Sequence, residues 1–506
     1  MKHLLLLLVF FLTQIAGIQA QNSQQKPNII LVMADQWRRQ ALGFTNEDAV
    51  LTPELDAYSK EAAFFKNAVA NTPICTPSRA TMFTGQYNIT NGVFGNHVRL
   101  STNSITLGDI TKDQGYHTAY IGKYHLDGKS EGYVPRSRRH GFDYWILSSH
   151  HRPFDQNYYI QDARQPVTIP GWEPDYMTGK AIEYIDSVAD IDQNPFCMVL
   201  SFGPPHTGGG PGFEDRYQPD KFIGNSNKHK MGYGYAAPKK YEALYPTPEK
   251  MKRRPNVAPV GKFGAESWPV LPGYFGAITS IDENFGKLIR FLKKKGIFEN
   301  TIIVFTADHG EMLGSHGRMT KGIWNEESIG VPMMLSYPGK IKPDTYKNPM
   351  ATIDILPTVL GLAGLPAPAH IEGFNYENVL TGKNGQAAPE YAYCSFDQGA
   401  PDSKDRSWRA IYNDQYTYII AKPNEYKRDK VRKEGFLLYD KRKDPYEMQP
   451  IYKGMGYDAV IDDLHAKLVA HLTKLNDPFL TLQWKTDSSP KYTWFDAKDK
   501  KSSTPK

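Results

Sequence analysis

Three seven-residue runs of mostly apolar residues constrain the fold of this 506-residue chain more than any other feature. They occupy positions 28–34, 196–202 and 301–307, and so lie far apart along the chain. A strand with one solvent-facing side alternates apolar and polar residues, whereas a strand buried on both faces is apolar along its length. Each run is therefore predicted to form a central strand of a sheet that is covered on both faces.

Helix signals fill the segments between these runs. Thr52 and Pro53 open a predicted helix at 52–65, and Gly296 ends another that begins at residue 274. The remaining predictions are helices at 106–114, 175–189 and 352–364, and shorter strands at 118–122 and 331–337. Alternating strands and helices predict an α/β fold, in which a large, mostly parallel sheet is sandwiched by helices.

The pattern changes near residue 386. Short strands separated by polar turns are predicted at 390–396, 407–412, 416–421 and 436–439, and an amphipathic helix at 458–475. These elements predict a smaller C-terminal α+β subdomain built on an antiparallel sheet. We expect a first domain at residues 27–385, this subdomain at 386–484, and a polar, Lys-rich tail at 485–506.

Residues 1–20 have the features of a signal peptide. Met1-Lys2-His3 form a short basic start, and the apolar run at 4–12 is too short to span a bilayer. Ala20 suits the last position before cleavage, and no cysteine follows the run to carry a lipoprotein anchor. We therefore predict an exported protein, in a periplasm or secreted, with no membrane anchor.

The composition narrows the classes of partner. A net charge of +6 is small for this length and is not typical of a nucleic-acid-binding protein, although it is compatible with an anionic substrate. The three cysteines, Cys75, Cys197 and Cys394, are too few for a disulfide framework. Cys197 and Cys394 lie in apolar runs and are expected in the core.

Polar side chains follow the predicted strands at the point where each strand ends. They are Asp35 and Gln36, Lys123 and His125, His206, and Asp308 and His309. The carboxyl ends of parallel strands meet at one edge of a sheet, where open α/β sheets bind their ligands. Carboxylate and amide oxygens suit calcium or magnesium, so a divalent-cation site is predicted at this edge.

A second motif stands at residues 71–85, where Cys75 lies between Pro73 and Pro77. The prolines disfavour helix immediately before them, and Ser78 is predicted to cap a helix through residues 80–82. Cys75 is thus expected in a turn at a helix N-terminus, where backbone N–H groups and the helix dipole favour anions. Taken alone, such a cysteine is more often a small buried residue.

The whole stretch Cys75-Thr76-Pro77-Ser78-Arg79, closed by Thr84-Gly85, resembles the signature of the type I sulfatases of the alkaline phosphatase superfamily. The resemblance covers nearly the whole mature chain. It implies that a formylglycine-generating maturation enzyme converts Cys75 to formylglycine. The hydrated aldehyde has two geminal hydroxyls: one attacks sulfur, and the other, once deprotonated, expels sulfate.

The resemblance also implies a metal site, usually calcium, with magnesium less expected. Its ligands would be Asp35, Gln36, the modified Cys75, Asp308 and His309. Gln36 stands where many members have Asp, and His309 where many have Asn. Gln36 removes one negative charge, which should weaken metal affinity, and histidine is a poor match for calcium on hardness grounds.

Catalytic roles follow from the same resemblance. Lys123 would bind a sulfate oxygen and the hydrate, and His125 would take the proton that allows the sulfated intermediate to collapse. His206 and Lys321 would hold the sulfate and assist the departing alcohol oxygen, while Arg79 would orient the hydrate.

His316 lies between Asp308 and Lys321 in the sequence. Two interpretations are open for it, because it either lines the pocket or has a structural role.

Together these features predict an exported sulfatase that hydrolyses sulfate esters on a sulfated carbohydrate, such as ulvan, carrageenan or glycosaminoglycan fragments. Residues 207–272 are expected to wall the substrate cleft, and their tyrosines to stack on sugars: Tyr217, Tyr233, Tyr235, Tyr241 and Tyr245. A phosphonate monoester or phosphodiester hydrolase of the same superfamily is the main alternative. A third is a non-catalytic glycan-binding protein on a sulfatase fold.

Overall fold

The computed structural model describes residues 26–480 except 129–131, 150–152, 190, 192–193, 207–233, 246–250, 259–269, 386, 398–406, 422–430 and 432–434. The predicted signal peptide and the predicted tail lie outside the described residues, as does most of segment 207–272. Within the described ranges, no helix combines the length and the apolar character needed to cross a membrane.

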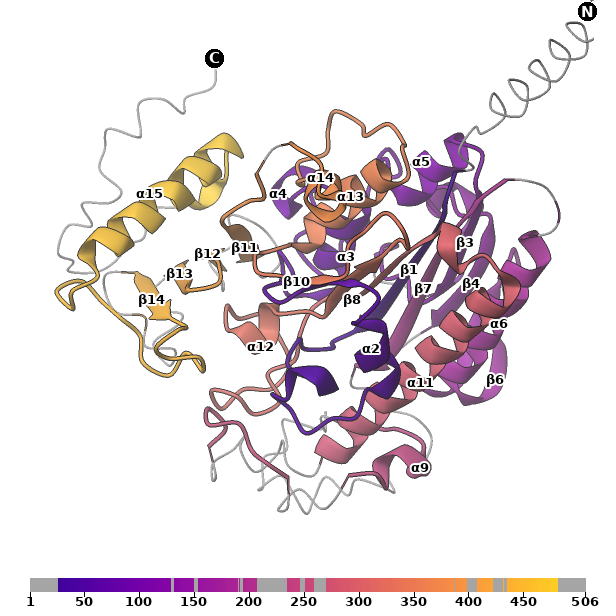
Figure 1. Cartoon of the computed structure of the whole chain (residues 1–506), viewed down its shortest axis with the longest axis horizontal. Helices are drawn as coiled ribbons and strands as arrows, with labels where there is room; N and C mark the ends of the chain where they lie inside the picture. The colour runs from indigo at the N-terminus through magenta and orange to yellow at the C-terminus, as the bar shows by residue number, and fades with distance from the viewer. Residues whose placement is uncertain are drawn as a thin grey trace, which may run out of the picture.

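A ten-stranded sheet runs through the larger part of the molecule, with strand order β10-β2-β9-β8-β1-β7-β3-β4-β5-β6 (Figure 1). The strands are β1 (Asn28–Asp35), β2 (Ala63–Phe65), β3 (His117–Gly122), β4 (Tyr144–Ser149), β5 (Phe154–Ile160), β6 (Val167–Trp172), β7 (Phe196–Pro205), β8 (Thr301–Ala307), β9 (Met333–Ser336) and β10 (Asp344–Tyr346). The central strands β8, β1, β7, β3 and β4 pair in parallel. Antiparallel pairs flank them on both sides, so the sheet is mixed but parallel at its centre.

The three apolar runs form three adjacent central strands. β1 lies between β7 and β8, with Ile29 opposite both Cys197 and Ile302. Every side chain of β8 is buried, as expected of a strand covered on both faces. Their predicted position at the centre of a doubly covered sheet is therefore confirmed.

Helices cover both faces of the sheet, as predicted (Figure 1). On one face, α11 (Leu271–Lys295) packs against both α2 (Pro53–Tyr58) and α6 (Glu173–Val188). Among the described residues, the other helices of the larger part are α3 (Cys75–Thr84), α4 (Asn88–Asn91), α5 (Leu107–Asp113), α9 (Lys239–Glu242), α12 (Glu326–Ile329), α13 (Ile355–Leu362) and α14 (Glu377–Thr381). Short 3-10 helices are η1 (Gly43–Thr45), η2 (Arg136–Arg138), η4 (Phe298–Asn300), η5 (Thr352–Asp354) and η7 (Pro478–Leu480).

Some predicted elements have different limits. The helix predicted at 52–65 ends at Tyr58, and the chain then enters β2. Thr52 does not cap it: its Oγ1 accepts from the backbone N–H of Gly43 at 2.7 Å and donates to Asp56 at 2.7 Å. α11 ends as predicted, because Gly296 adopts a left-handed conformation with φ 77°. Strands β4, β5 and β6 were not predicted.

The C-terminal region forms a four-stranded antiparallel sheet covered by one helix, as predicted (Figure 1). Its elements are β11 (Ala392–Asp397), β12 (Ser407–Tyr412), β13 (Tyr416–Ala421), β14 (Phe436–Asp440) and α15 (Asp458–Lys474). One face of this sheet packs against α15 through residues such as Ile411 and Leu464, and the other contributes Trp408 to a core shared with Trp324 and Ile329 of the larger part. We keep the domain limits 27–385 and 386–484 as a proposal.

Candidate active site

Four side chains from three separate segments meet at one edge of the large sheet. They are Asp35 at the end of β1, Cys75 at the start of α3, and Asp308 and His309 directly after β8. All four are buried, and one ligand atom from each lies within 4.8 Å of the others. The sequence predicted that these residues come together, and the structure places them together.

Local backbone geometry aims these side chains. The register between β1 and β7 shifts between Ala34 and Asp35, and Gln36 then adopts a positive φ of 68°, which turns the chain at the end of the strand. Asp308 stays hydrogen-bonded to the end of β1, because its N–H donates to the Ala34 carbonyl at 3.3 Å. Both carboxylates therefore emerge from adjacent strands at the same level.

Cys75 is the first residue of α3, and Ile74 before it is extended. Cys75 lies at a helix N-terminus as predicted, but it is already part of the helix and not of a turn before it, and the predicted capping role of Ser78 is wrong. Ser78 lies inside the helix, and its hydroxyl donates to the backbone carbonyl of Asp308. The helix is thus tied to the loop after β8 rather than capped by its own side chain.

Arg79 contacts both carboxylates and is completely buried. Its Nε lies 2.9 Å from Oδ2 of Asp308, and its Nη2 lies 3.2 Å from Oδ2 of Asp35. Its Nη1 donates to the Lys123 carbonyl at 2.7 Å and to the Ser201 hydroxyl at 2.9 Å. These contacts hold the two carboxylates side by side; the predicted role of Arg79 in orienting the hydrate stays a prediction.

The carboxylates divide their oxygens between two tasks. Oδ2 of Asp35 pairs with Arg79 and with Lys123, whereas Oδ1 of both Asp35 and Asp308 lies 3.6 Å from Nε2 of His309. Burial and the Cys75 sulfur each raise the pKa of Asp35, but the cations around it, Lys123 foremost, hold that pKa well below its ordinary value. Asp35 is therefore ionised at neutral pH.

His309 presents a ring nitrogen to the cluster. Its Nδ1 lies 2.9 Å from the Gly310 carbonyl and donates to it as Nδ1–H, so Nε2 faces Asp35 and Asp308. Burial alone would lower the pKa of the ring, but the negative charge of Asp308 raises that pKa above its ordinary value, and Nε2 offers its lone pair to a cation when it carries no proton. A metal-ligating histidine is oriented in this way by a backbone carbonyl. Two carboxylate oxygens and an imidazole nitrogen thus face the same buried position, and this set of donor atoms fits a divalent cation.

The surroundings of Cys75 favour an anion. Its Sγ lies 3.2 Å from Nε2 of His309. Burial raises the pKa of the Cys75 thiol, but Lys321, then Lys123 and His309, bring that pKa well below its ordinary value. A negatively charged group bound at this position would meet the same cations.

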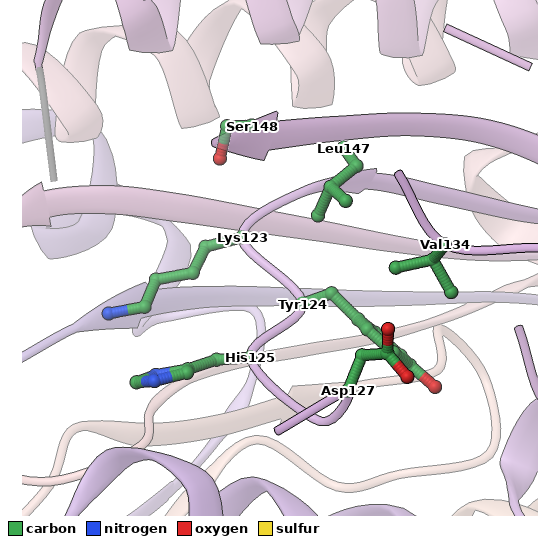
Figure 2. Close-up of a pocket in the computed structure, with 7 residues that line it drawn as sticks. All are labelled: Lys123, Tyr124, His125, Asp127, Val134, Leu147 and Ser148. Atoms are coloured by element: carbon green, nitrogen blue, oxygen red, sulfur yellow. The ribbon is translucent and has the colours of Figure 1, made fainter. Parts of the chain in front are cut away.

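Lys123 and His125 follow β3, and both side chains point to the same side of their loop, whereas Tyr124 and Asp127 point away (Figure 2). Lys123 pairs with Asp35, so it belongs to the cluster. His125 has a positive φ of 54°, and it contributes a hydrogen bond that lowers the pKa of Cys75. Both residues also line a small pocket beside the cluster, together with Tyr124, Asp127, Val134, Leu147 and Ser148.

His206 and Lys321 form a pair beside Cys75. Nζ of Lys321 lies 2.9 Å from Nε2 of His206, and it also donates to Oε1 of Gln36. Burial, followed by the nearby Lys321, lowers the pKa of His206, so its imidazole is neutral at pH 7. The structure thus brings His206, Lys321 and Gln36 together next to the cluster.

His316 lies apart from this group. Its ring nitrogen Nε2 lies 3.2 Å from the Asn256 side-chain amide and 3.3 Å from that of Asn325. These contacts join three loop segments, and so support the structural interpretation of His316 over the pocket-lining one.

One buried acidic residue was not predicted from the sequence. Glu311 is completely buried, and its Oε2 accepts a hydrogen bond from Nε2 of Gln36. The sequence feature that could have identified Glu311 is its position three residues after Asp308, because a charged residue so close to a strand-end cluster is not expected to face solvent.

The predicted sugar-stacking tyrosines have other positions wherever they are described. Tyr235, Tyr241 and Tyr245 are all buried, so the stacking prediction is wrong for these three. Tyr241 donates to Glu283 of α11 at 2.8 Å, and the Tyr235 hydroxyl lies 3.1 Å from Nε2 of Gln36. Tyr217 and Tyr233 lie outside the described residues.

Comparison with known proteins agrees with this geometry. A family model described as Sulfatase matches residues 27–365, and one described as N-sulphoglucosamine sulphohydrolase, C-terminal, matches residues 314–474. The chain is 34% identical to an ulvan-active sulfatase of Formosa agariphila, over 92% of this chain and 85% of that protein. It is 26% identical to an endo-4-O-sulfatase of Bacteroides thetaiotaomicron, over 93% and 97% of the two chains.

A solved structure from Bacteroides fragilis, described as the putative sulfatase yidJ, superposes with a TM-score of 0.76 at 32% identity. The match covers 91% of this chain and 98% of that one. The fold, the strand-end cluster and the sequence similarity therefore agree. The chain is a sulfuric ester hydrolase that belongs to the sulfatase family, within the alkaline phosphatase superfamily.

Proposed function

We propose that this protein hydrolyses sulfate esters on a sulfated carbohydrate, with formylglycine made from Cys75 as its nucleophile. The observation that carries the proposal is the convergence of Asp35, Cys75, Asp308 and His309 within 4.8 Å, surrounded by the cations Lys123 and Lys321. A sulfate ester is an anion that gains further charge on its leaving oxygen, and such a site stabilises both.

Asp35, Gln36, Asp308 and His309, with the modified residue 75, would hold one divalent ion, which we propose to be calcium rather than magnesium. The ion would stabilise negative charge on sulfate oxygens, and formylglycine hydrate would supply the attacking hydroxyl. Oxygen donors from two carboxylates and an amide favour calcium, whereas magnesium requires a more regular octahedral site.

The other residues divide the work of binding and proton transfer. Lys123 and Lys321 flank residue 75 and would hold sulfate oxygens. Lys321 donates to the neutral His206, so this pair has a proton to give to the departing alcohol oxygen. His125, on the loop after β3, would accept the proton whose removal releases sulfate.

The substrate class rests on the relatives. One is named for its activity on ulvan, and the other for the removal of 4-O-sulfate by endo action. We propose a sulfated polysaccharide or its fragments as the substrate, and export to a periplasm or the outside as the location. A formylglycine-generating enzyme is the required maturation partner.

The test is sulfate release from desalted ulvan, carrageenan and glycosaminoglycan fragments by protein that has been co-expressed with a maturation enzyme. Cys75→Ala is expected to abolish release, whereas the matched control Cys394→Ala, which alters a buried cysteine of β11, is expected to retain it. The mass of the peptide around residue 75 reports the aldehyde, which is lighter than the thiol. Equal release by wild type and Cys75→Ala would refute the proposal.

Two further measurements separate the alternatives. Faster turnover of nitrophenyl phenylphosphonate than of nitrophenyl sulfate would favour the phosphonate hydrolase. An unmodified Cys75 in protein that binds glycan without releasing sulfate would favour the non-catalytic alternative.

A further inference from the structure

Glu311 has a set of partners that none of the proposed catalytic steps uses. Its side chain is completely buried and accepts hydrogen bonds from two backbone N–H groups and from the Gln36 amide, and the Tyr235 hydroxyl is a further hydrogen-bond partner. Its Oε1 accepts from the backbone N–H of Leu313 at 2.8 Å and of Thr320 at 2.6 Å, and its Oε2 accepts from the side-chain amide of Gln36. A carboxylate can satisfy three donors at once because it carries only acceptors.

The carboxylate determines which way the Gln36 amide points. An amide has one acceptor end and one donor end, and only the donor end can face Glu311. Nε2 of Gln36 lies 3.1 Å from the Tyr235 hydroxyl on the same side. Oε1 of Gln36 must therefore point the other way, where it accepts from the ammonium of Lys321.

The same carboxylate also holds the loop that leads to Lys321. Leu313 and Thr320 stand at the two ends of one loop segment, and both donate to Oε1 of Glu311. Lys321 follows Thr320 directly. One buried group thus fixes both the amide oxygen of Gln36 and the backbone next to the lysine that this oxygen contacts.

We propose that Glu311 is a positioning residue, which selects the orientation of the Gln36 amide and thereby presents its oxygen, rather than its NH2 group, to cations at the active site. This inference rests on the proposed function for the role of Gln36 as a metal ligand. A glutamine at position 36 requires such a partner because it has a single oxygen, whereas a carboxylate there presents an oxygen whichever way it turns.

The proposal makes the effect of Glu311→Gln depend on residue 36. In Glu311→Gln the new amide cannot accept from Leu313, Thr320 and Gln36 together. Gln36 turns over to restore its hydrogen bond, and its NH2 group then faces Lys321 and the cation site. In the Gln36→Glu background no oxygen is lost in this way, because the amide at position 311 donates to one oxygen of the introduced carboxylate and the other oxygen remains available.

The experiment measures the calcium concentration that gives half-maximal thermal stabilisation of four proteins that retain Cys75: wild type, Glu311→Gln, Gln36→Glu and the double variant. Glu311→Gln is expected to raise that concentration about 10- to 100-fold when residue 36 is the native glutamine. In the Gln36→Glu background, the same Glu311→Gln change is expected to raise the half-maximal calcium concentration by much less. Equal losses in the two backgrounds would overturn the proposal, because a role in charge or folding alone does not depend on an amide.

Glu327→Gln is the matched control. Glu327 is also a buried glutamate of this region, but its partners are Arg254 and Asn256 and not Gln36. We expect its calcium midpoint to stay near that of wild type, and a shift as large as that of Glu311→Gln would count against the proposal.

The proposal can still be tested if Glu311→Gln does not fold or if the wild type has no sulfatase activity. If Glu311→Gln does not fold alone, the comparison of Gln36→Glu with the double variant decides: a tenfold loss between them overturns the proposal, and a smaller loss supports it. If matured wild type releases no sulfate, the proposed function fails, yet the calcium midpoints still test the positioning role.

Discussion

The two oxygens of each active-site carboxylate face different partners, and this division is the central feature at the scale of single residues. Arg79 takes Oδ2 of both Asp35 and Asp308, and the Oδ1 atoms point toward His309. A buried pair of like charges is tolerated because buried cations offset it: the Arg79 guanidinium contacts both carboxylates, and Lys123 pairs with Asp35. The same contact leaves one oxygen of each carboxylate available to a metal.

Replacement of Arg79 should therefore destabilise the protein before it affects any chemistry. We expect Arg79→Ala to lower the free energy of unfolding by about 3–5 kcal/mol, because it removes the guanidinium from the buried Asp308 carboxylate and leaves Asp35 with Lys123 alone. Urea unfolding in the presence of a chelator measures this. The control is Arg136→Ala, which removes an exposed pair with Asp162 and should leave the unfolding midpoint unchanged; a similar loss in both variants would contradict the argument.

Glu173 predicts a pH dependence of stability. Burial raises its pKa to about 8 from an ordinary value of 4.5. Between these values the folded state holds a proton that the unfolded state has lost, so the contribution of Glu173 to stability is fully present below about pH 4.5 and is lost as the pH rises toward 8. The slope from this one group reaches about 1.4 kcal/mol per pH unit.

Glu173→Gln should remove this contribution. We expect the variant to unfold at a midpoint that changes less between about pH 5 and 8, and to be more stable than wild type at about pH 8. Chemical unfolding across this pH range provides the measurement, and parallel pH profiles for the two proteins would show that Glu173 does not titrate as expected.

At the scale of secondary structure elements, helices α6 and α11 cover the same face of the sheet but use glycine differently. A Cβ added at Gly179 in α6 would meet nothing within 4 Å. A Cβ added at Gly273 in α11 would collide with the backbone carbonyl of Tyr235. Segment 234–237 thus approaches α11 closely only because residue 273 lacks a side chain.

The two glycines should respond in opposite directions to alanine. Gly179→Ala is expected to stabilise the protein by about 0.5–1 kcal/mol, because alanine is the better helix former and no neighbour obstructs it. Gly273→Ala is expected to destabilise it and to weaken calcium binding, because Tyr235 contacts Gln36. Thermal unfolding with and without calcium compares them; stabilisation by Gly273→Ala would show that segment 234–237 moves at no cost.

At the scale of the whole molecule, the C-terminal sheet completes the catalytic part rather than standing beside it. Trp408 of β12 is buried against Trp324, and its indole N–H donates to the Gly322 carbonyl at 3.2 Å, next to Lys321. The core that contains Trp408 includes residues from both parts. Packing of the smaller sheet therefore reaches the loop that carries a proposed catalytic lysine.

Trp408→Ala should consequently reduce both stability and turnover. We expect a loss of about 3–5 kcal/mol from the lost packing, together with a lower kcat/KM in the protein that remains folded. Leu464→Ala on α15 is the control, because it empties the core on the other face of the same sheet. Calorimetry and steady-state sulfate release measure the two effects, and an equal fall in kcat/KM for both variants would contradict a specific link to Lys321.

The parts of the structure that follow from sequence alone are those with a local signature. A strand buried on both faces must be apolar throughout, so β1, β7 and β8 could be recognised from their own residues. The polar residues that follow them could then be grouped, because the carboxyl ends of parallel strands share one edge. Asp35, Asp308 and His309 were predicted together for that reason.

Only the tertiary structure decided the contacts that have no local signature. Gln36 and Glu311 are 275 positions apart, and Arg79 and Asp308 are 229 apart. The burial of Tyr235 likewise depends on how close α11 approaches its segment. A hydrogen-bond partner is set by which elements pack together, so the chain determined the central strands and the residues at their ends, and the packed fold determined how each of those side chains is held.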